Sequence, residues 1–191
     1  MKRGALRLLL IGIAGGVCYA GMCFFSCGPT NPTKSTSLND LVLTDQINGW
    51  VVDSVAGYFV ESTMANYVDG GSSNYCGSCS LSTLKEGFKM LMGKPPTVDK
   101  LRFYVINYGT AANAKAEFDF MVQGSSWTTE NALSPYSVTD VFYTSNSDGV
   151  NAHAHFKNFY IELQLTAFGS SSEAVPDAKL YIDYFHSKIG Q

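Results

Sequence analysis

Alternating apolar and polar residues predict β-strands along much of the chain. The clearest case is residues 159–168, where the apolar members are Ile161, Leu163 and Leu165 and the polar members are Glu162, Gln164 and Thr166. A strand with one buried face produces this period of two. Further strand patterns lie at residues 50–52, 58–60, 100–108, 138–143 and 152–156. Residues 84–92 fit a strand and a helix almost equally well, and the turn sequence at 93–96 favours a hairpin with residues 100–108.

Helical spacing is found in two longer segments. In residues 110–122, Thr110 is a suitable N-cap, alanines recur and Gly124 follows the end. A last helix is expected from residue 172 or 175 to residue 189, with Pro176 in its first turn. A short helix is also expected at residues 63–68, with Ser62 as its cap. These elements predict an α+β fold, an antiparallel sheet packed with a central and a C-terminal helix.

The first 26 residues have the pattern of an export signal. Lys2, Arg3 and Arg7 precede residues 8–25, which carry no charge. This apolar run is long for a signal peptide and close to the lower limit for a transmembrane helix. An uncleaved transmembrane helix and a plain cleaved signal are therefore alternatives to the interpretation that follows.

The sequence FFSCG at residues 24–28 resembles the lipobox of bacterial lipoproteins. Ser26 matches the small residue before the cysteine, whereas Phe24 stands where leucine is usual. The resemblance implies that the signal is removed, that Cys27 carries a thioether-linked diacylglycerol and that its new amino group is acylated. Two or more acyl chains hold a protein stably on a membrane. Gly28 in place of Asp implies sorting to the outer membrane by the enterobacterial rule.

This interpretation divides the chain into a signal peptide at 1–26, a lipidated Cys27 with a flexible tether at 27–37, and a single domain at 38–191. Once the three leader cations are removed, the 13 cations fall to 10 against 16 acids, a net charge of about −6. Nucleic acids bind through clustered cations, so this balance argues against a nucleic-acid partner. It also argues against a polybasic contact with anionic lipid.

The cysteines that remain after lipidation of Cys27 are Cys76 and Cys79. An even pair in an oxidising compartment is expected to form a disulfide. Because the enclosed loop is so short, closing it stabilises the fold by only ~2 kcal/mol. A redox-active dithiol and a pair of metal ligands are the alternatives. The residues before Cys76 are typical of a loop rather than of the buried strand that precedes a thioredoxin-like motif.

Several short patterns in the domain resemble a group of uncharacterised secreted bacterial proteins. The patterns are Trp50, Tyr58, YVDGG at 67–71, GF at 87–88 and INYGT at 106–110, which leads into the alanine-rich helix. These proteins are similar in architecture to PsbP-like α/β domains. The resemblance covers most of residues 49–191 and implies that fold and a non-enzymatic binding role. It supplies no catalytic residues.

Other chemistry-bearing side chains receive structural interpretations. His153 and His155 share one face of a predicted strand, but zinc or copper binding needs a third ligand, so solvent-facing histidines are expected. Glu117 and Asp119 on the central helix are also expected to face solvent. No metal site and no catalytic residue is predicted.

The sequence therefore predicts a membrane-tethered lipoprotein of the cell envelope with a non-enzymatic role in binding a protein or a small ligand. The expected location is the outer membrane, with the domain facing the periplasm or the cell surface. The only cofactor-like group is the covalent lipid at Cys27. The alternative function is a periplasmic thiol–disulfide oxidoreductase that uses Cys76 and Cys79.

Overall fold

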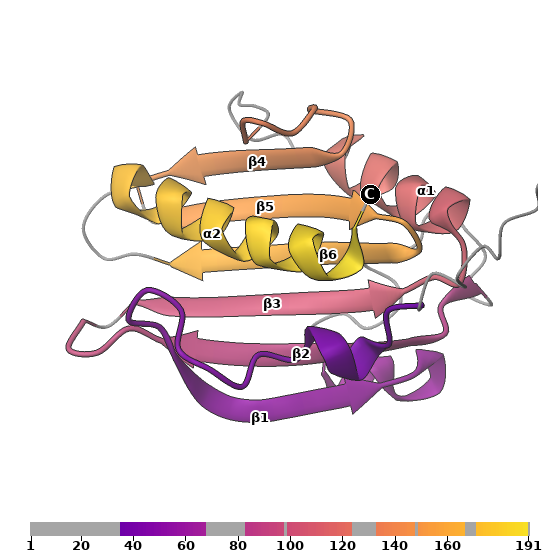
Figure 1. Ribbon diagram of the computed structural model, residues 1–191, viewed down its shortest axis with the longest axis horizontal. Helices are drawn as coiled ribbons and strands as arrows, with labels where there is room; N and C mark the ends of the chain where they lie inside the picture. The colour runs from indigo at the N-terminus through magenta and orange to yellow at the C-terminus, as the bar shows by residue number, and fades with distance from the viewer. Residues whose placement is uncertain are drawn as a thin grey trace, which may run out of the picture. The chain divides into compact units, whose positions relative to one another are not determined.

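The computed structural model describes residues 35–67, 83–97, 99–123, 133–147, 149–166 and 171–190. These residues belong to one compact unit, Ser35–Gln191. Within this part of the chain the strands form a six-stranded antiparallel sheet in the order β1-β2-β3-β6-β5-β4 (Figure 1). The predicted α+β architecture is confirmed.

The helices and strands follow one another in a simple order. Two short 3₁₀ helices, η1 and η2, flank the first strand. The elements are η1 (Leu38–Leu41), β1 (Val51–Phe59), η2 (Glu61–Asn66), β2 (Glu86–Gly93), β3 (Lys100–Asn107), α1 (Ala111–Gln123), β4 (Val141–Asn146), β5 (Gly149–Phe156), β6 (Phe159–Thr166) and α2 (Ser171–Ile189).

Hairpins build both halves of the sheet. β2 and β3 pair without interruption from Glu86↔Asn107 to Gly93↔Lys100, which confirms the predicted hairpin. β4, β5 and β6 form a second set of consecutive hairpins. β6 then pairs with β3 and joins the two halves at the centre of the sheet. The chain between β3 and β4 contains α1, as the sequence predicted.

The sheet carries a helix on each face. On β3, Leu101, Phe103 and Val105 pack in the same core cluster as α2 and η1, whereas Tyr104 and Ile106 pack with α1. Figure 1 shows α2 crossing in front of β5 and β6, with α1 behind the sheet near one end. The face opposite α2 is therefore covered by α1 only at that end, among the described residues.

Several element boundaries differ from the sequence prediction. Residues 50–52 and 58–60 do not form two short strands; Val51–Phe59 form one strand, β1, whose pairing with β2 has two register shifts. The N–H groups of Asp140 and Val141 donate to the carbonyl of Ser137, so a turn delays the start of β4. Pro176 lies in the second turn of α2 and is exposed, so the predicted placement in the first turn is wrong.

The short helix after β1 also differs from its prediction. It is the 3₁₀ helix η2 at Glu61–Asn66, so the expected start at residue 63 behind a Ser62 cap is wrong. Thr63 fixes this start instead, because its hydroxyl accepts a hydrogen bond of 3.1 Å from the N–H of Val60.

Asp177 on α2 forms hydrogen bonds with the segment before β1 and with the residue after β2. Its carboxylate accepts hydrogen bonds from Asn48 Nδ2 at 2.8 Å, Trp50 Nε1 at 3.0 Å and Lys94 Nζ at 2.6 Å. The Trp50 side chain is fully buried. Burial by itself raises the pKa of the Asp177 carboxyl, but the hydrogen bonds from Lys94, Trp50 and Asn48 outweigh it and hold the pKa below its ordinary value.

Candidate functional site

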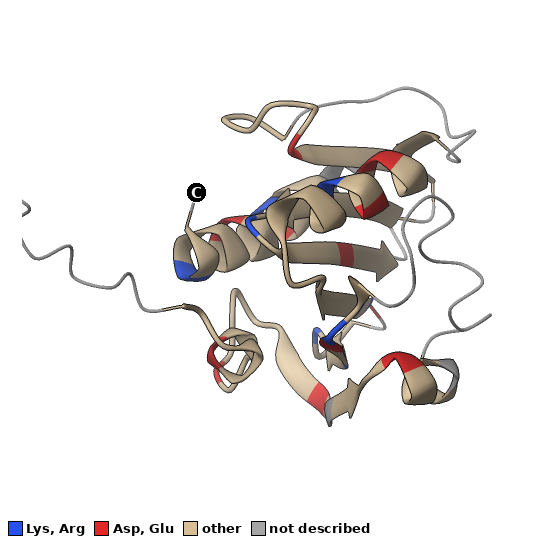
Figure 2. Ribbon diagram, turned by 90° about the vertical axis from the view of Figure 1, so that its right-hand side faces the viewer, with Lys and Arg blue, Asp and Glu red and all other residues tan. Residues whose placement is uncertain are grey.

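Polar side chains line up in rows on the sheet face opposite α2. Strands alternate their side chains between faces, so residues paired across neighbouring strands stand side by side. Arg102, Gln164, Asn151 and Thr144 form such a row across β3, β6, β5 and β4. We call these four residues the central polar row. Figure 2 shows that only short stretches of the strands are charged.

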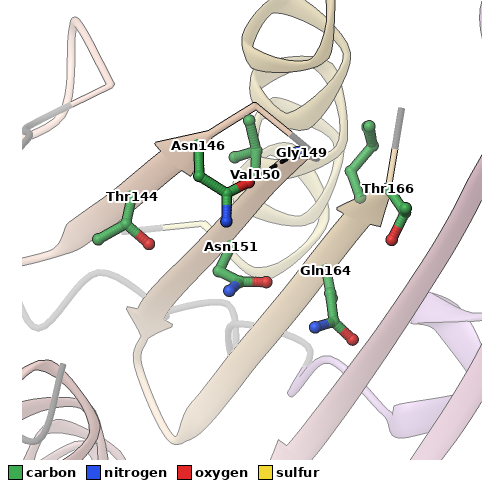
Figure 3. Close-up of a pocket in the computed structure, with 8 residues that line it drawn as sticks. Thr144, Asn146, Gly149, Val150, Asn151, Gln164 and Thr166 are labelled. Atoms are coloured by element: carbon green, nitrogen blue, oxygen red, sulfur yellow. Dashed lines mark hydrogen bonds between the residues drawn. The ribbon is translucent and has the colours of Figure 1, made fainter. Parts of the chain in front are cut away.

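A hollow of about 100 Å³ lies beside the central polar row, at the turn end of the β4–β5 hairpin. Among the described residues, five uncharged polar side chains line it, together with the backbone of Gly149 and with Val150 and Leu165. The five are Thr144, Asn146, Asn151, Gln164 and Thr166. Figure 3 shows these side chains on the near side of strands β4, β5 and β6, with α2 behind the sheet.

Gly149 permits the close approach of strands that shapes this hollow. A Cβ atom at this position would lie 1.9 Å from the carbonyl oxygen of Leu165, closer than any real contact. The backbone N–H of Gly149 donates a hydrogen bond of 3.0 Å to Asn146 Oδ1 (Figure 3). Glycine thus fixes both the strand spacing and the position of one amide in the hollow.

Only some of the polar groups in the hollow form hydrogen bonds with one another. The Arg102 guanidinium donates to Gln164 Oε1, which leaves the NH₂ group of Gln164 to donate elsewhere. The side chains of Thr144, Asn151 and Thr166 make no hydrogen bond within the described parts of the chain. The hollow therefore offers donors and acceptors that are fixed in place and still available.

A buried histidine borders the central polar row on the side of α1. His153 pairs directly across the sheet with Glu162. It is only 8% exposed, and its Nδ1 lies 2.8 Å from the hydroxyl of Tyr160. Burial lowers the pKa of His153, although the nearby Glu162 carboxylate acts in the opposite direction. Folding therefore favours the neutral form of the His153 ring.

His155 is also largely enclosed. Its Nε2 lies 2.9 Å from the carbonyl oxygen of Thr139, and Phe118 of α1 packs against its ring with centroids 5.1 Å apart. The prediction that His153 and His155 share a strand face is confirmed. The prediction that they face solvent is wrong, because α1 packs on this end of β5.

α1 also buries a carboxyl group. Glu117 is completely enclosed beside Tyr108, so the prediction that it faces solvent is wrong. Burial, followed by the charge and hydrogen bonding of Glu117, raises the pKa of Tyr108 far above its ordinary value. Asp119 faces outward as predicted and pairs with Lys115 at 2.7 Å. The carboxyl group of Glu117 therefore lies in the interface between α1 and the sheet, whereas that of Asp119 lies in solvent.

The predicted lipidation and cysteine sites lie outside the described residues. This applies to Cys27 and to Cys76 and Cys79. Within the described ranges, no group of three or more His, Cys, Asp or Glu side chains could hold a metal ion. No helix in the same ranges is long and apolar enough to cross a membrane.

Comparison with known proteins finds structural likeness only at a distant level. No protein-family model and no curated protein matches the chain. The crystal structure of the extracellular domain of PknH from Mycobacterium tuberculosis is similar over 72% of this chain and 81% of that one, with a TM-score of 0.42 and 11% sequence identity. A likeness this distant assigns no family and no function.

Sequence reasoning did not identify the residues of the hollow. The alternation in β6 had placed Gln164 and Thr166 on a polar face, but nothing placed Thr144 and Asn151 beside them. The signal present in the sequence is the tight turn at 147–149, which brings β4 and β5 together. Recognising the site also needed the pairing of β5 with β6.

Proposed function

We propose that the chain is a lipoprotein of the cell envelope, tethered through Cys27, whose domain binds a ligand on the polar face of its sheet. The tether rests on the basic and apolar leader and on the lipobox-like residues 24–28. The location that follows is the outer membrane, with the domain facing the periplasm or the cell surface. A PsbP-like relationship agrees with the antiparallel sheet and its two helices.

The observation that carries the binding role is the hollow on β4, β5 and β6. Binding sites are concave and use a small number of fixed polar groups to orient a ligand. Here Gly149 and Arg102 hold the amides of Asn146 and Gln164 in place. The described residues of the lining all lie on strands, so binding requires little ordering of this part of the protein.

Metabolic labelling with a fatty-acid probe tests the tether. Wild-type chain is expected to incorporate the label and Cys27→Ala to lose it, because the cysteine sulfur accepts the diacylglycerol. Cys23→Ala is the matched control and should keep the label, since Met22 stands where a lipobox needs a small residue. Label retained by Cys27→Ala, or a mature chain that still begins at Met1, would contradict the proposal.

A further inference from the structure

We propose that the hollow beside the central polar row binds a neutral, hydroxyl-rich ligand, one ring of a carbohydrate. This inference rests on the proposed function in one respect, namely that the polar sheet face is the ligand-binding face. It adds the chemical class of the ligand. Three properties of the hollow support it: its lack of charge, the kind of hydrogen-bonding groups it contains, and their spacing.

Among the residues that the structure describes, no charged side chain lines the hollow. Arg102 donates to Gln164 and Lys100 pairs with Asp53 at 2.9 Å, and neither cation is part of the described lining. A phosphate or carboxylate ligand would have to leave water without an ion pair from the described lining side chains. A metal ion would lack the carboxylate and imidazole ligands that it prefers. The lining therefore favours an uncharged ligand.

The lining matches the hydrogen-bonding properties of sugar hydroxyls. Each sugar hydroxyl donates one hydrogen bond and accepts others. Asn, Gln and Thr side chains also donate and accept, so either polarity can be satisfied. Among the described residues, Thr144, Asn151 and Thr166 have this capacity unused. An extended peptide, in contrast, pairs through its backbone with a strand edge rather than with side chains on a sheet face.

The spacing across the strands suits a six-membered ring. Thr144, Asn151 and Gln164 are paired on three adjacent strands. Neighbouring strands lie about 5 Å apart, a distance comparable with the width of a sugar ring. A volume of about 100 Å³ has room for several water molecules and hence for the hydroxyls along one side of a ring. The rest of the ligand would remain in solvent, which predicts weak binding, with a Kd of about 1 mM.

The test is a titration followed by NMR of side-chain amides. The full chain, ¹⁵N-labelled, is held in lauryldimethylamine oxide micelles, because this detergent has no sugar headgroup. Maltotriose, cellotriose and tri-N-acetylchitotriose are the probes. We expect at least one of them to shift the amide signals of Asn151 and Gln164 in a saturable way. Inorganic phosphate at the same concentration should leave these signals in place.

Asn151→Leu keeps the side-chain size, removes the amide and should weaken binding about tenfold, as the loss of one or two hydrogen bonds implies. Its matched control is Asn39→Leu, an exposed position on η1, which should bind like the wild type. Thr166→Val supplies a second variant if Asn151→Leu does not fold, and it should also weaken binding.

The proposal is overturned if none of the three sugars gives a saturable shift up to about 20 mM, a concentration well above the expected Kd. It is equally overturned if phosphate gives the stronger shift, or if the folded variant binds as tightly as the wild type. The titration does not depend on the lipid, so its failure would leave the assignment of Cys27 to be decided by the labelling experiment.

Discussion

Removing the Asp177 carboxylate should destabilise the domain more than removing any comparable surface carboxylate on α2. Asp177 is 7% exposed and accepts three hydrogen bonds, from Asn48, Trp50 and Lys94. Two of the three donors come from the segment before β1, and the third follows β2. The Asp177→Ala variant therefore releases both segments from α2 at once.

The magnitude follows from what each donor loses. The Trp50 indole N–H is buried and would lose its partner, at a cost of about 1–3 kcal/mol. The Lys94 ammonium lies 2.6 Å from the carboxylate with its side chain 30% exposed, so solvent would recover part of its loss and about 1 kcal/mol remains. The Asn48 bond adds about 0.5–1 kcal/mol. A total of about 3–4 kcal/mol lowers Tm by about 10 °C for a domain of this size.

The assay is thermal unfolding of wild type and Asp177→Ala, followed by near-UV circular dichroism at several pH values. The control is Asp183→Ala on the same helix. Asp183 also accepts two hydrogen bonds of 2.6 Å, from Tyr136 and Lys179, but its side chain is 41% exposed. Solvent screening therefore limits the loss in the control to about 1 kcal/mol.

The pH dependence provides an independent check on the same reasoning. Because folding lowers the pKa of Asp177, its stabilisation is fully present above the pKa of the unfolded chain, ~3.9, and is lost as the pH falls through the folded value. The difference in Tm between wild type and Asp177→Ala should therefore stay constant from pH 6 down to about pH 4 and narrow below it. A difference below about 3 °C at pH 6, or one that does not change with pH, would refute the argument.

Three further predictions follow from the structure and the sequence. Gly149→Ala should cost about 1–3 kcal/mol of unfolding free energy in urea, since its Cβ would collide with the Leu165 carbonyl; wild-type stability would contradict this. Because burial lowers the pKa of His153, the wild type should lose stability below pH 6.5, by at most about 1.4 kcal/mol per pH unit. The His153→Gln variant should not show this loss. Equal urea midpoints of the wild type across pH 5–8 would contradict the prediction. A Cys76→Ser, Cys79→Ser double variant should lose only ~2 kcal/mol of unfolding free energy. The wild-type disulfide should resist reduction by glutathione, whereas ready thiol–disulfide exchange would favour the oxidoreductase alternative.

Local patterns predicted most of the secondary structure correctly. The alternation in β6 and the Thr110 cap of α1 are local properties, and Thr110 Oγ1 does accept the N–H of Asn113 at 3.2 Å. The ambiguous segment at 84–92 became β2 because β3 offered it a partner along its whole length. Periodicity alone could not decide this case, since the pairing energy comes from another part of the chain.

Burial of polar residues was where local reasoning failed. Glu117 and His153 looked like surface residues, yet α1 and the sheet enclose both. No local pattern indicated that Asp177 is buried and hydrogen-bonded, because its three donors, at residues 48, 50 and 94, are distant in the sequence. Such sites depend on which segments pack together, and neither residue type nor spacing records that.

The sequence alone determined the existence and the kind of the main elements, because hydrophobic period, caps and turns act over a few residues. It also supplied every indication of the lipid anchor, since a processing signal is a linear motif. The tertiary structure alone decided which strands became neighbours. That choice brought Thr144, Asn151 and Gln164 into one hollow, because only the pairing of β4, β5 and β6 sets side chains from separate strands about 5 Å apart.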